Sequence, residues 1–184
     1  MANGEIIVEQ LVKQYGDFMA VDGVSFKVDS GEIFGFLGPN GAGKSTVVKM
    51  LTTLSLPSSG RATVGGFDIE KEAQDVRRVS GVALQEIGLD PLLKSMELLT
   101  IQGQLFGESR KEARQRAVEL LDLVKLSDVT ERPVGKYSGG MRRRLDLAMA
   151  LVHRPDVLFL DEPTTGLDPA SRRDVWNEVR RLNR

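Results

Sequence analysis

The fold is decided by the stretch Gly38-Pro39-Asn40-Gly41-Ala42-Gly43-Lys44-Ser45, which matches G-x-x-x-x-G-K-[ST] in every fixed position. The apolar run before it, residues 33–37, is predicted to be a buried strand, and residues 46–51 after it are predicted to form a helix. Glycines let successive N–H groups turn toward an anion, and the helix N-terminus adds its positive end. The motif therefore predicts a phosphate-binding loop, in which Lys44 reaches the β- and γ-phosphates and the Ser45 hydroxyl ligates Mg²⁺.

A second apolar run, residues 157–160, is predicted to be a strand buried on both faces, and it ends in Asp161 and Glu162. Two neighbouring buried carboxylates repel each other unless a cation or a proton intervenes. A Mg²⁺ near Asp161 and a water near Glu162 would resolve this conflict, with Glu162 polarising the attacking water as a general base. The alternative, an acidic helix N-terminus, fits less well because residues 163–166 continue as a loop.

A third motif, Ser138-Gly139-Gly140, precedes an amphipathic segment that has apolar residues at helical spacing. Ser138 is a good N-cap, and the two glycines permit close backbone approach to an anion. Taken alone the motif is weak, since Ser-Gly-Gly is common in loops. Its weight comes from its position between the phosphate loop and the Asp161–Glu162 pair.

Together these motifs resemble the nucleotide-binding subunit of an ATP-binding cassette (ABC) transporter, over essentially the whole chain. Walker A maps onto residues 38–46, the signature onto 138–141, Walker B onto 157–162 and the aspartate loop onto 166–168. The runs 137–146 and 161–169 are similar to the daunorubicin/doxorubicin-resistance type of exporter ATPase. Met141 stands where many members have glutamine, as is common in the drug-exporter branch.

The resemblance implies a set of site residues. Catalytic roles fall to Glu162, Lys44 and Gln85, and Mg²⁺ ligation falls to Ser45, Gln85 and Asp161. Gln85 takes the place of the family's glutamine loop, Tyr15 that of an aromatic stacking on adenine, and Asp168 that of a residue communicating across a dimer. The ATP contacts implied are Tyr15, Gly38, Pro39, Asn40, Gly41, Ala42, Gly43, Lys44, Ser45, Thr46, Ser138, Gly139 and Gly140.

The resemblance also implies an architecture: an α/β P-loop NTPase core with a parallel sheet, a small antiparallel β subdomain and an inserted helical subdomain at about 86–150. We expect one nucleotide-binding domain over 1–184, with residues 6–11, 24–28 and 61–64 as strands of the small sheet and Tyr15 in a loop between the first two. Ser109 to Glu112 reads as a capping box. The insert would dock on a membrane subunit, although a plain helical cap remains an alternative.

Composition narrows the class of protein. The chain has 184 residues, 41% of them hydrophobic, no cysteine and a net charge of -1. No disulfide framework or thiol-based zinc site is therefore expected, and general nucleic-acid binding is disfavoured. Without an 18-residue apolar run or a signal-peptide layout, we expect a cytosolic domain. The resemblance implies that a permease partner holds this domain at the cytoplasmic face of the membrane. The arginines 142–144 are expected on a solvated face, and His153 is expected to be structural.

Phosphoryl transfer depends on positioning and on neutralising charge around the γ-phosphate. The resemblance implies that a second cassette supplies its signature in trans, in a head-to-tail dimer holding two ATP molecules, and that hydrolysis drives an exporter. Two alternatives stay open: a soluble ABC ATPase not coupled to transport, and a module that only binds nucleotide. The family's switch histidine has no counterpart here, so we expect a C-terminally incomplete, hydrolysis-deficient cassette whose sheet has a gap between strands 33–37 and 157–160.

Overall fold

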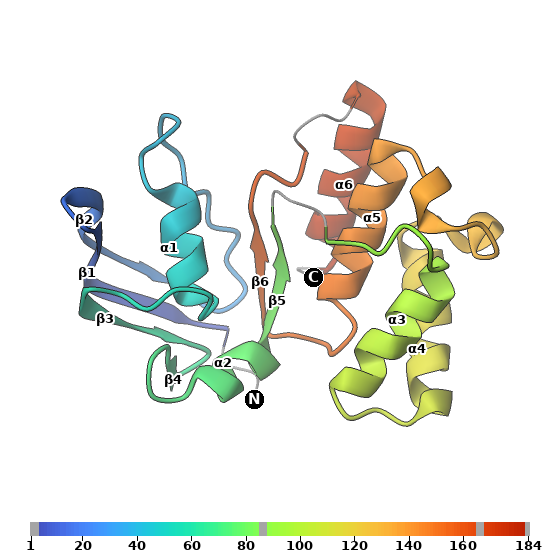
Figure 1. Cartoon of the computed structure of the whole chain (residues 1–184), viewed down its shortest axis with the longest axis horizontal. Coiled ribbons are helices and arrows are strands. Elements are labelled where there is room, and N and C mark those ends of the chain that lie inside the picture. The colour runs from blue at the N-terminus through green and yellow to red at the C-terminus, as the bar shows by residue number, and fades with distance from the viewer. Residues whose placement is uncertain (1–3, 85–87, 165–167, 183–184) are drawn as a thin grey trace. The chain divides into compact units, whose positions relative to one another are not determined.

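The computed structural model describes residues 4–84, 88–164 and 168–182 (Figure 1). The chain divides into two compact units, the first ending at Ser80 and the second running from Gly81 to Leu182. Each unit has its own sheet and its own helices. The mixture of an antiparallel sheet, a parallel sheet and helices confirms the predicted α/β class.

The first unit is built on an antiparallel sheet with strand order β2-β1-β3-β4. Its strands are β1 (Ile6–Tyr15), β2 (Phe18–Val28), β3 (Ser59–Val64) and β4 (Phe67–Asp68). The three strands predicted for the small sheet are thus present, and β1 and β2 are longer than expected. Placing Tyr15 in a loop was wrong, because it is the last residue of β1 and pairs with Phe18 across a tight turn.

Two helices complete this unit, α1 (Lys44–Leu51) and α2 (Ala73–Val79). Helix α1 contacts β2 and β3, and it buries Val47, Met50 and Leu51. These residues lie three and four positions apart, which is the spacing of one helix face. The sheet contributes most of the other core side chains, namely Ile6, Val8, Leu11, Val21, Val28, Ala62 and Val64.

The predicted strand at residues 33–37 was wrong, since the structure has no strand there. A strand needs a hydrogen-bonded neighbour, and within the described residues this segment takes part in no sheet. Its aromatic side chains instead pack against β2: Phe34 stacks on Phe26 with ring centroids 5.3 Å apart, and Phe36 lies 5.4 Å from the same ring. Leu37 at the end of the segment is 94% exposed.

The second unit pairs β5 (Ser80–Ala83) with β6 (Val157–Leu160) in a two-stranded parallel sheet. Strand β6 confirms the second predicted strand, although Leu158 and Leu160 are only half-buried. The helices are α3 (Ser95–Leu105), α4 (Arg110–Leu123), α5 (Gly139–Ala150) and α6 (Pro169–Leu182), with short 3₁₀ turns at Ser127–Val129 and Val134–Lys136. Among the described residues, no helix is long and apolar enough to cross a bilayer.

One hydrophobic cluster holds the helices of the second unit together. Its members come from α3, α4, α5 and α6 and from the segments between them, and Leu158 and Leu160 of β6 pack against it. The face that α4 and its C-cap turn to this cluster is apolar and buried, with Ala113, Ala117, Leu120, Leu121 and Val124 all inside.

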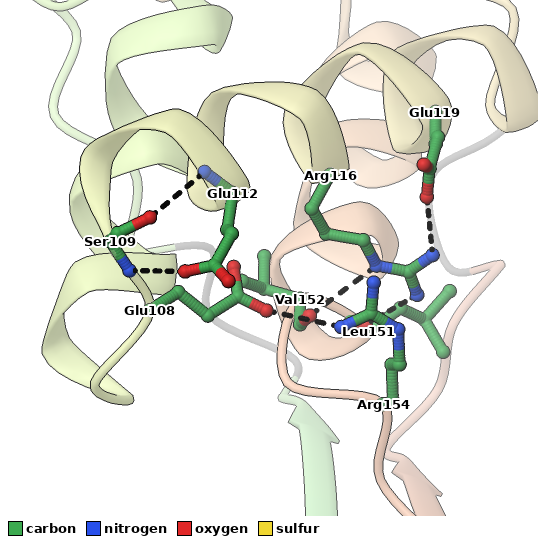
Figure 2. A network of polar contacts seen from close by, with 8 residues as sticks. All are labelled: Glu108, Ser109, Glu112, Arg116, Glu119, Leu151, Val152 and Arg154. Atoms are coloured by element: carbon green, nitrogen blue, oxygen red, sulfur yellow. Dashed lines mark hydrogen bonds and ion pairs between the residues drawn. The ribbon is translucent and has the colours of Figure 1, made fainter.

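The start of α4 follows the predicted capping box. The Ser109 Oγ accepts from the Glu112 N–H at 3.3 Å, and a Glu112 carboxylate oxygen accepts from the Ser109 N–H at 2.9 Å (Figure 2). Two N–H groups that the helix itself cannot satisfy thereby find acceptors. Hydrogen bonding of the Glu112 carboxylate by Ser109, first by its hydroxyl and then by its backbone N–H, holds the pKa of Glu112 below its ordinary value.

His153 lies three residues beyond the end of α5. Its ring stacks on Phe106, with centroids 3.9 Å apart and planes only 6° from parallel. This packing supports the structural role that was expected for the single histidine of the chain.

Candidate functional site

The phosphate loop, residues 38–45, lies in the first unit and leads directly into α1. Gly43 is the N-cap with φ 82°, and Gly41 has φ 83°, so two residues of the loop are left-handed. A Cβ on Gly43 would lie 2.3 Å from the Ala20 carbonyl oxygen, so only glycine fits against β2 at this point. The loop therefore combines a curled backbone with a close approach to the sheet, as the motif predicted.

Lys44 is the first residue of α1, and its side chain turns back over the loop. Its Nζ donates to the carbonyl oxygens of Gly38 and Pro39, each at 2.8 Å. The ammonium group is thus held beside the loop backbone at the positive end of an eight-residue helix. Ser45 and Thr46 follow in the first turn and are half-buried. These residues fit a bound phosphate group, because cation, helix N-terminus and glycine backbone lie together.

Tyr15 belongs to the same unit as the phosphate loop. Its side chain is half exposed, and the Lys13 Nζ lies 4.8 Å from the ring centroid. The ring therefore interacts with a cation through its face. Stacking of Tyr15 on adenine stays a prediction.

The acidic pair lies in the second unit, directly after β6. Asp161 is 9% exposed, and its N–H donates to the Ala83 carbonyl at 3.0 Å, which extends the β5–β6 pairing by one residue. Glu162, by contrast, is exposed and has a left-handed backbone with φ 49°. The expectation of two buried carboxylates was therefore wrong for Glu162, because the chain turns away from the sheet at this residue.

The Ser138-Gly139-Gly140 motif begins α5. The Ser138 Oγ accepts from the Met141 N–H at 3.2 Å, which confirms the predicted N-cap. Ser138 and Gly139 are exposed, and no atom lies within 4 Å of a Cβ built on Gly139. Tyr137, the residue before the motif, is buried. Its hydroxyl donates to the Val129 carbonyl at 2.9 Å, and the same hydroxyl oxygen lies 3.1 Å from the Ser95 Oγ.

A family model described as ABC transporter matches residues 21–165, which is most of the chain. The chain belongs to the ABC transporter family. The recognition made from the motifs is thereby confirmed, and the matched residues include the segments assigned to Walker A (38–46), the signature (138–141) and Walker B (157–162).

Known relatives support this membership. The chain is 49% identical to a daunorubicin resistance ATP-binding protein of Streptomyces coeruleorubidus over 95% of its own length and 54% of the relative's. It is 46% identical to a Nod factor export ATP-binding protein I of Burkholderia thailandensis, over 99% of its length and 60% of the relative's. The chain thus spans little more than half the length of the curated relatives it matches.

Solved structures agree on the fold. A dimeric ATP-binding cassette described as a post-hydrolysis state bound to ADP and Pi matches with a TM-score of 0.86 and 26% identity, covering 97% of this chain and 82% of that one.

The predicted site residues fall into two sets in this cassette. Tyr15 and residues 38–46 belong to the first unit, whereas Ser138, Gly139, Gly140, Asp161 and Glu162 belong to the second. Gln85 lies outside the described residues, as do residues 166 and 167 of the aspartate loop. Within the described part of the chain, no three His, Asp or Glu side chains group as metal ligands. The Mg²⁺ set of Ser45, Gln85 and Asp161 therefore stays a prediction.

Arg143 is the residue of this site that sequence reasoning missed. The arginines 142–144 were expected on a solvated face, but Arg143 is only 5% exposed and lies against the Walker B segment. Its guanidinium donates to the carbonyls of Asp161 (2.8 Å), Pro163 (3.0 Å) and Leu84. A signal was available: Leu147 and Ala150 follow at i+4 and i+7, and both are buried on α5.

Proposed function

We propose that this cassette binds ATP with Mg²⁺ and hydrolyses it to drive an exporter. The observation that carries the proposal is the Walker A geometry, in which Lys44 is held over a loop with two left-handed glycines at the N-terminus of α1. This arrangement suits the β- and γ-phosphates of a nucleotide. Mg²⁺, held by Ser45, Asp161 and Gln85, would neutralise charge on the phosphate oxygens.

Glu162 is the proposed general base. It is an exposed carboxylate directly after the buried Asp161, so a water can reach it while Asp161 serves the metal. A positioned base of this kind typically contributes about 10²–10⁴-fold to the rate. Lys44 stabilises the γ-phosphate during transfer, and Tyr15 stacks on adenine.

The signature is proposed to act in trans, in a head-to-tail pair of cassettes. Ser138 and Gly139 are exposed at the N-terminus of α5, where backbone N–H groups favour an anion. A solved relative is a dimer described as bound to ADP and Pi, which is consistent with this arrangement. Two ATP molecules would then hold the dimer closed until hydrolysis opens it.

The partner of this dimer is proposed to be a transmembrane permease, with the helical subdomain at about 86–150 as its docking element. The cassette would then lie at the cytoplasmic face of the membrane. The resistance and export proteins among its relatives favour a drug-type exporter. Those relatives differ in the compound that they name, and we propose that the permease selects the transported substrate.

Two substitutions in the full-length protein test the chemistry. Glu162→Gln should lower ATP turnover by about 10²–10⁴-fold and leave ATP affinity within a few fold of the parent, because it removes the base and keeps the shape. Lys44→Ala should instead weaken nucleotide binding itself, measured by titration with a fluorescent ATP analogue in the presence of Mg²⁺. Turnover at the parent rate by Glu162→Gln would exclude this residue as the base.

A further inference from the structure

Glu162 has a backbone conformation that side-chain-bearing residues rarely adopt. Its φ is 49°, in the left-handed region. No other residue of the described segment 157–164 has a positive φ. Such a conformation persists where neighbouring groups hold it in place. Relaxation to an ordinary backbone angle would redirect the side chain, so whatever fixes φ also aims the carboxylate.

One side chain holds both neighbours of Glu162. The Nη2 of Arg143 donates to the carbonyl of Asp161 at 2.8 Å, and the Nε of the same guanidinium donates to the carbonyl of Pro163 at 3.0 Å. The two acceptors belong to the residues immediately before and after Glu162. A rigid, planar donor group therefore brackets the left-handed residue.

The third nitrogen of the Arg143 guanidinium, Nη1, and the positive charge of the group also find partners in this region. Nη1 donates to the carbonyl of Leu84, next to the end of β5, and to the Asp146 carboxylate at 3.2 Å. The guanidinium side chain is 6% exposed and that of Asp146 is 14% exposed, so the pair is largely withdrawn from solvent. Lysine cannot reproduce this arrangement, because its single nitrogen lacks the fixed fork of the guanidinium.

We propose that Arg143 is a positioning residue for Glu162: from the signature helix α5, it locks the backbone on both sides of Glu162 and thereby aims the carboxylate. The proposal rests on the assignment of Glu162 as the base. It links α5, which begins at the signature Ser138, to the acidic end of β6 through one side chain. Arg143 touches no reacting atom in this scheme and acts only through Glu162.

The neighbouring Arg144 supplies a matched control. It lies on the same helix, and its Nη1 also donates to two backbone carbonyls, those of Val124 and Lys125 at 3.0 and 3.2 Å. Those carbonyls belong to the end of α4 rather than to the Walker B segment. Arg143→Gln and Arg144→Gln thus remove the same charge and the same type of bond, but only the first releases Glu162.

The test compares these variants in the full-length protein. Arg143→Gln and Arg143→Lys should lower kcat for ATP about 10- to 100-fold with KM within about 2-fold, as expected when a catalytic group is misplaced. Arg144→Gln should leave both constants within about 2-fold. In a Glu162→Gln background, Arg143→Gln should produce no further loss of turnover. Hydrogen exchange of peptides covering 157–164 should be faster in Arg143→Gln than in Arg144→Gln.

Three results would overturn the proposal: equal kcat in the two arginine variants, an effect of Arg143→Gln on KM alone, or equal exchange of 157–164. The exchange comparison also serves if a variant is too unstable for kinetics, because it can be run at a temperature where each remains folded. If Glu162→Gln itself retained turnover, the proposed base would fail instead. Faster exchange in Arg143→Gln would then still support the part of the proposal that concerns the backbone on both sides of Glu162.

Discussion

Arg116 of α4 and Arg144 of α5 cap the C-terminal ends of each other's helices. The Arg116 guanidinium donates to the carbonyls of Leu151 (3.0 Å) and Val152 (3.4 Å), just after the end of α5 (Figure 2). Arg144 donates to Val124 and Lys125, just after the end of α4. Each helix end carries carbonyls without an intrahelical partner and a partial negative charge, so a cation there is favourable.

This reciprocal capping predicts a measurable contribution to stability. Arg116→Met or Arg144→Met should each lower the free energy of unfolding by about 1.5–3 kcal/mol, the range for hydrogen bonds to a charged group. Arg142→Met is the control: Arg142 is exposed on the same helix, and its change should stay within about 0.5 kcal/mol. Urea titration followed by circular dichroism measures all three. Equal effects at 142 and 144 would show that the carbonyl contacts contribute nothing.

The sequence predicted what depends on local chemistry. The Walker A loop, the Ser109 capping box and the Ser138 N-cap each follow from residues a few positions apart, and the structure has all three. The prediction of a strand at 33–37 failed because strand formation depends on a partner distant in the chain. The burial of Arg143 was not predicted because three consecutive arginines point in different directions, and only the packing of α5 against the end of β6 decides which one is buried.

Asp146 makes stability depend on pH. Burial raises its pKa from the ordinary 3.8 to about 6, an increase that the nearby Arg143 only partly offsets. A carboxyl with a raised folded-state pKa favours the native state more as it takes up its proton, so stability should rise as pH falls through about 6 toward the unfolded value. Between pH 7 and pH 5 this amounts to about 1 kcal/mol.

Asp146→Asn isolates that contribution. The difference in unfolding free energy between the parent and this variant should shift in favour of the parent by about 1 kcal/mol as pH drops from 7 to 5. Urea titrations at both pH values measure it. A difference that is constant over this interval, or that moves toward the variant, would contradict the raised pKa.

Alanine substitutions at two glycines of the Walker A loop distinguish the effect of backbone strain from that of a steric clash. Gly41 and Gly43 both have positive φ, but only a Cβ on Gly43 meets other atoms, at 2.3 Å from the Ala20 carbonyl oxygen and 3.0 Å from the Val21 Cγ2. Gly41→Ala should therefore cost only the left-handed strain of about 1–2 kcal/mol. Gly43→Ala should in addition displace the start of α1 from β2.

Nucleotide titration distinguishes the two outcomes. We expect Gly43→Ala to lose most of its affinity for a fluorescent ATP analogue, because the phosphate-binding N–H groups move with α1. Gly41→Ala should weaken binding by at most about 30-fold if only a strain of about 1–2 kcal/mol acts, since 1.4 kcal/mol corresponds to a factor of ten. Equal losses for both variants would mean that the contact with Ala20 does not govern the loop.

The last prediction concerns the trans role of the signature. Ser138→Arg, made in the Glu162→Gln background of the full-length protein, should abolish ATP-dependent dimerisation and leave the ATP affinity of the monomer unchanged. The physical reason is that Ser138 is exposed at the start of α5, so a long cation there would enter the partner interface. Ser138→Ala is the control for the lost N-cap, which alone costs about 1 kcal/mol. Sedimentation velocity with and without ATP measures both variants.

If the arginine variant dimerised as fully as its Glu162→Gln parent, the signature would not face a second cassette. If Ser138→Ala abolished dimerisation equally, the effect would belong to the cap, and the position of Ser138 in the interface would remain without support.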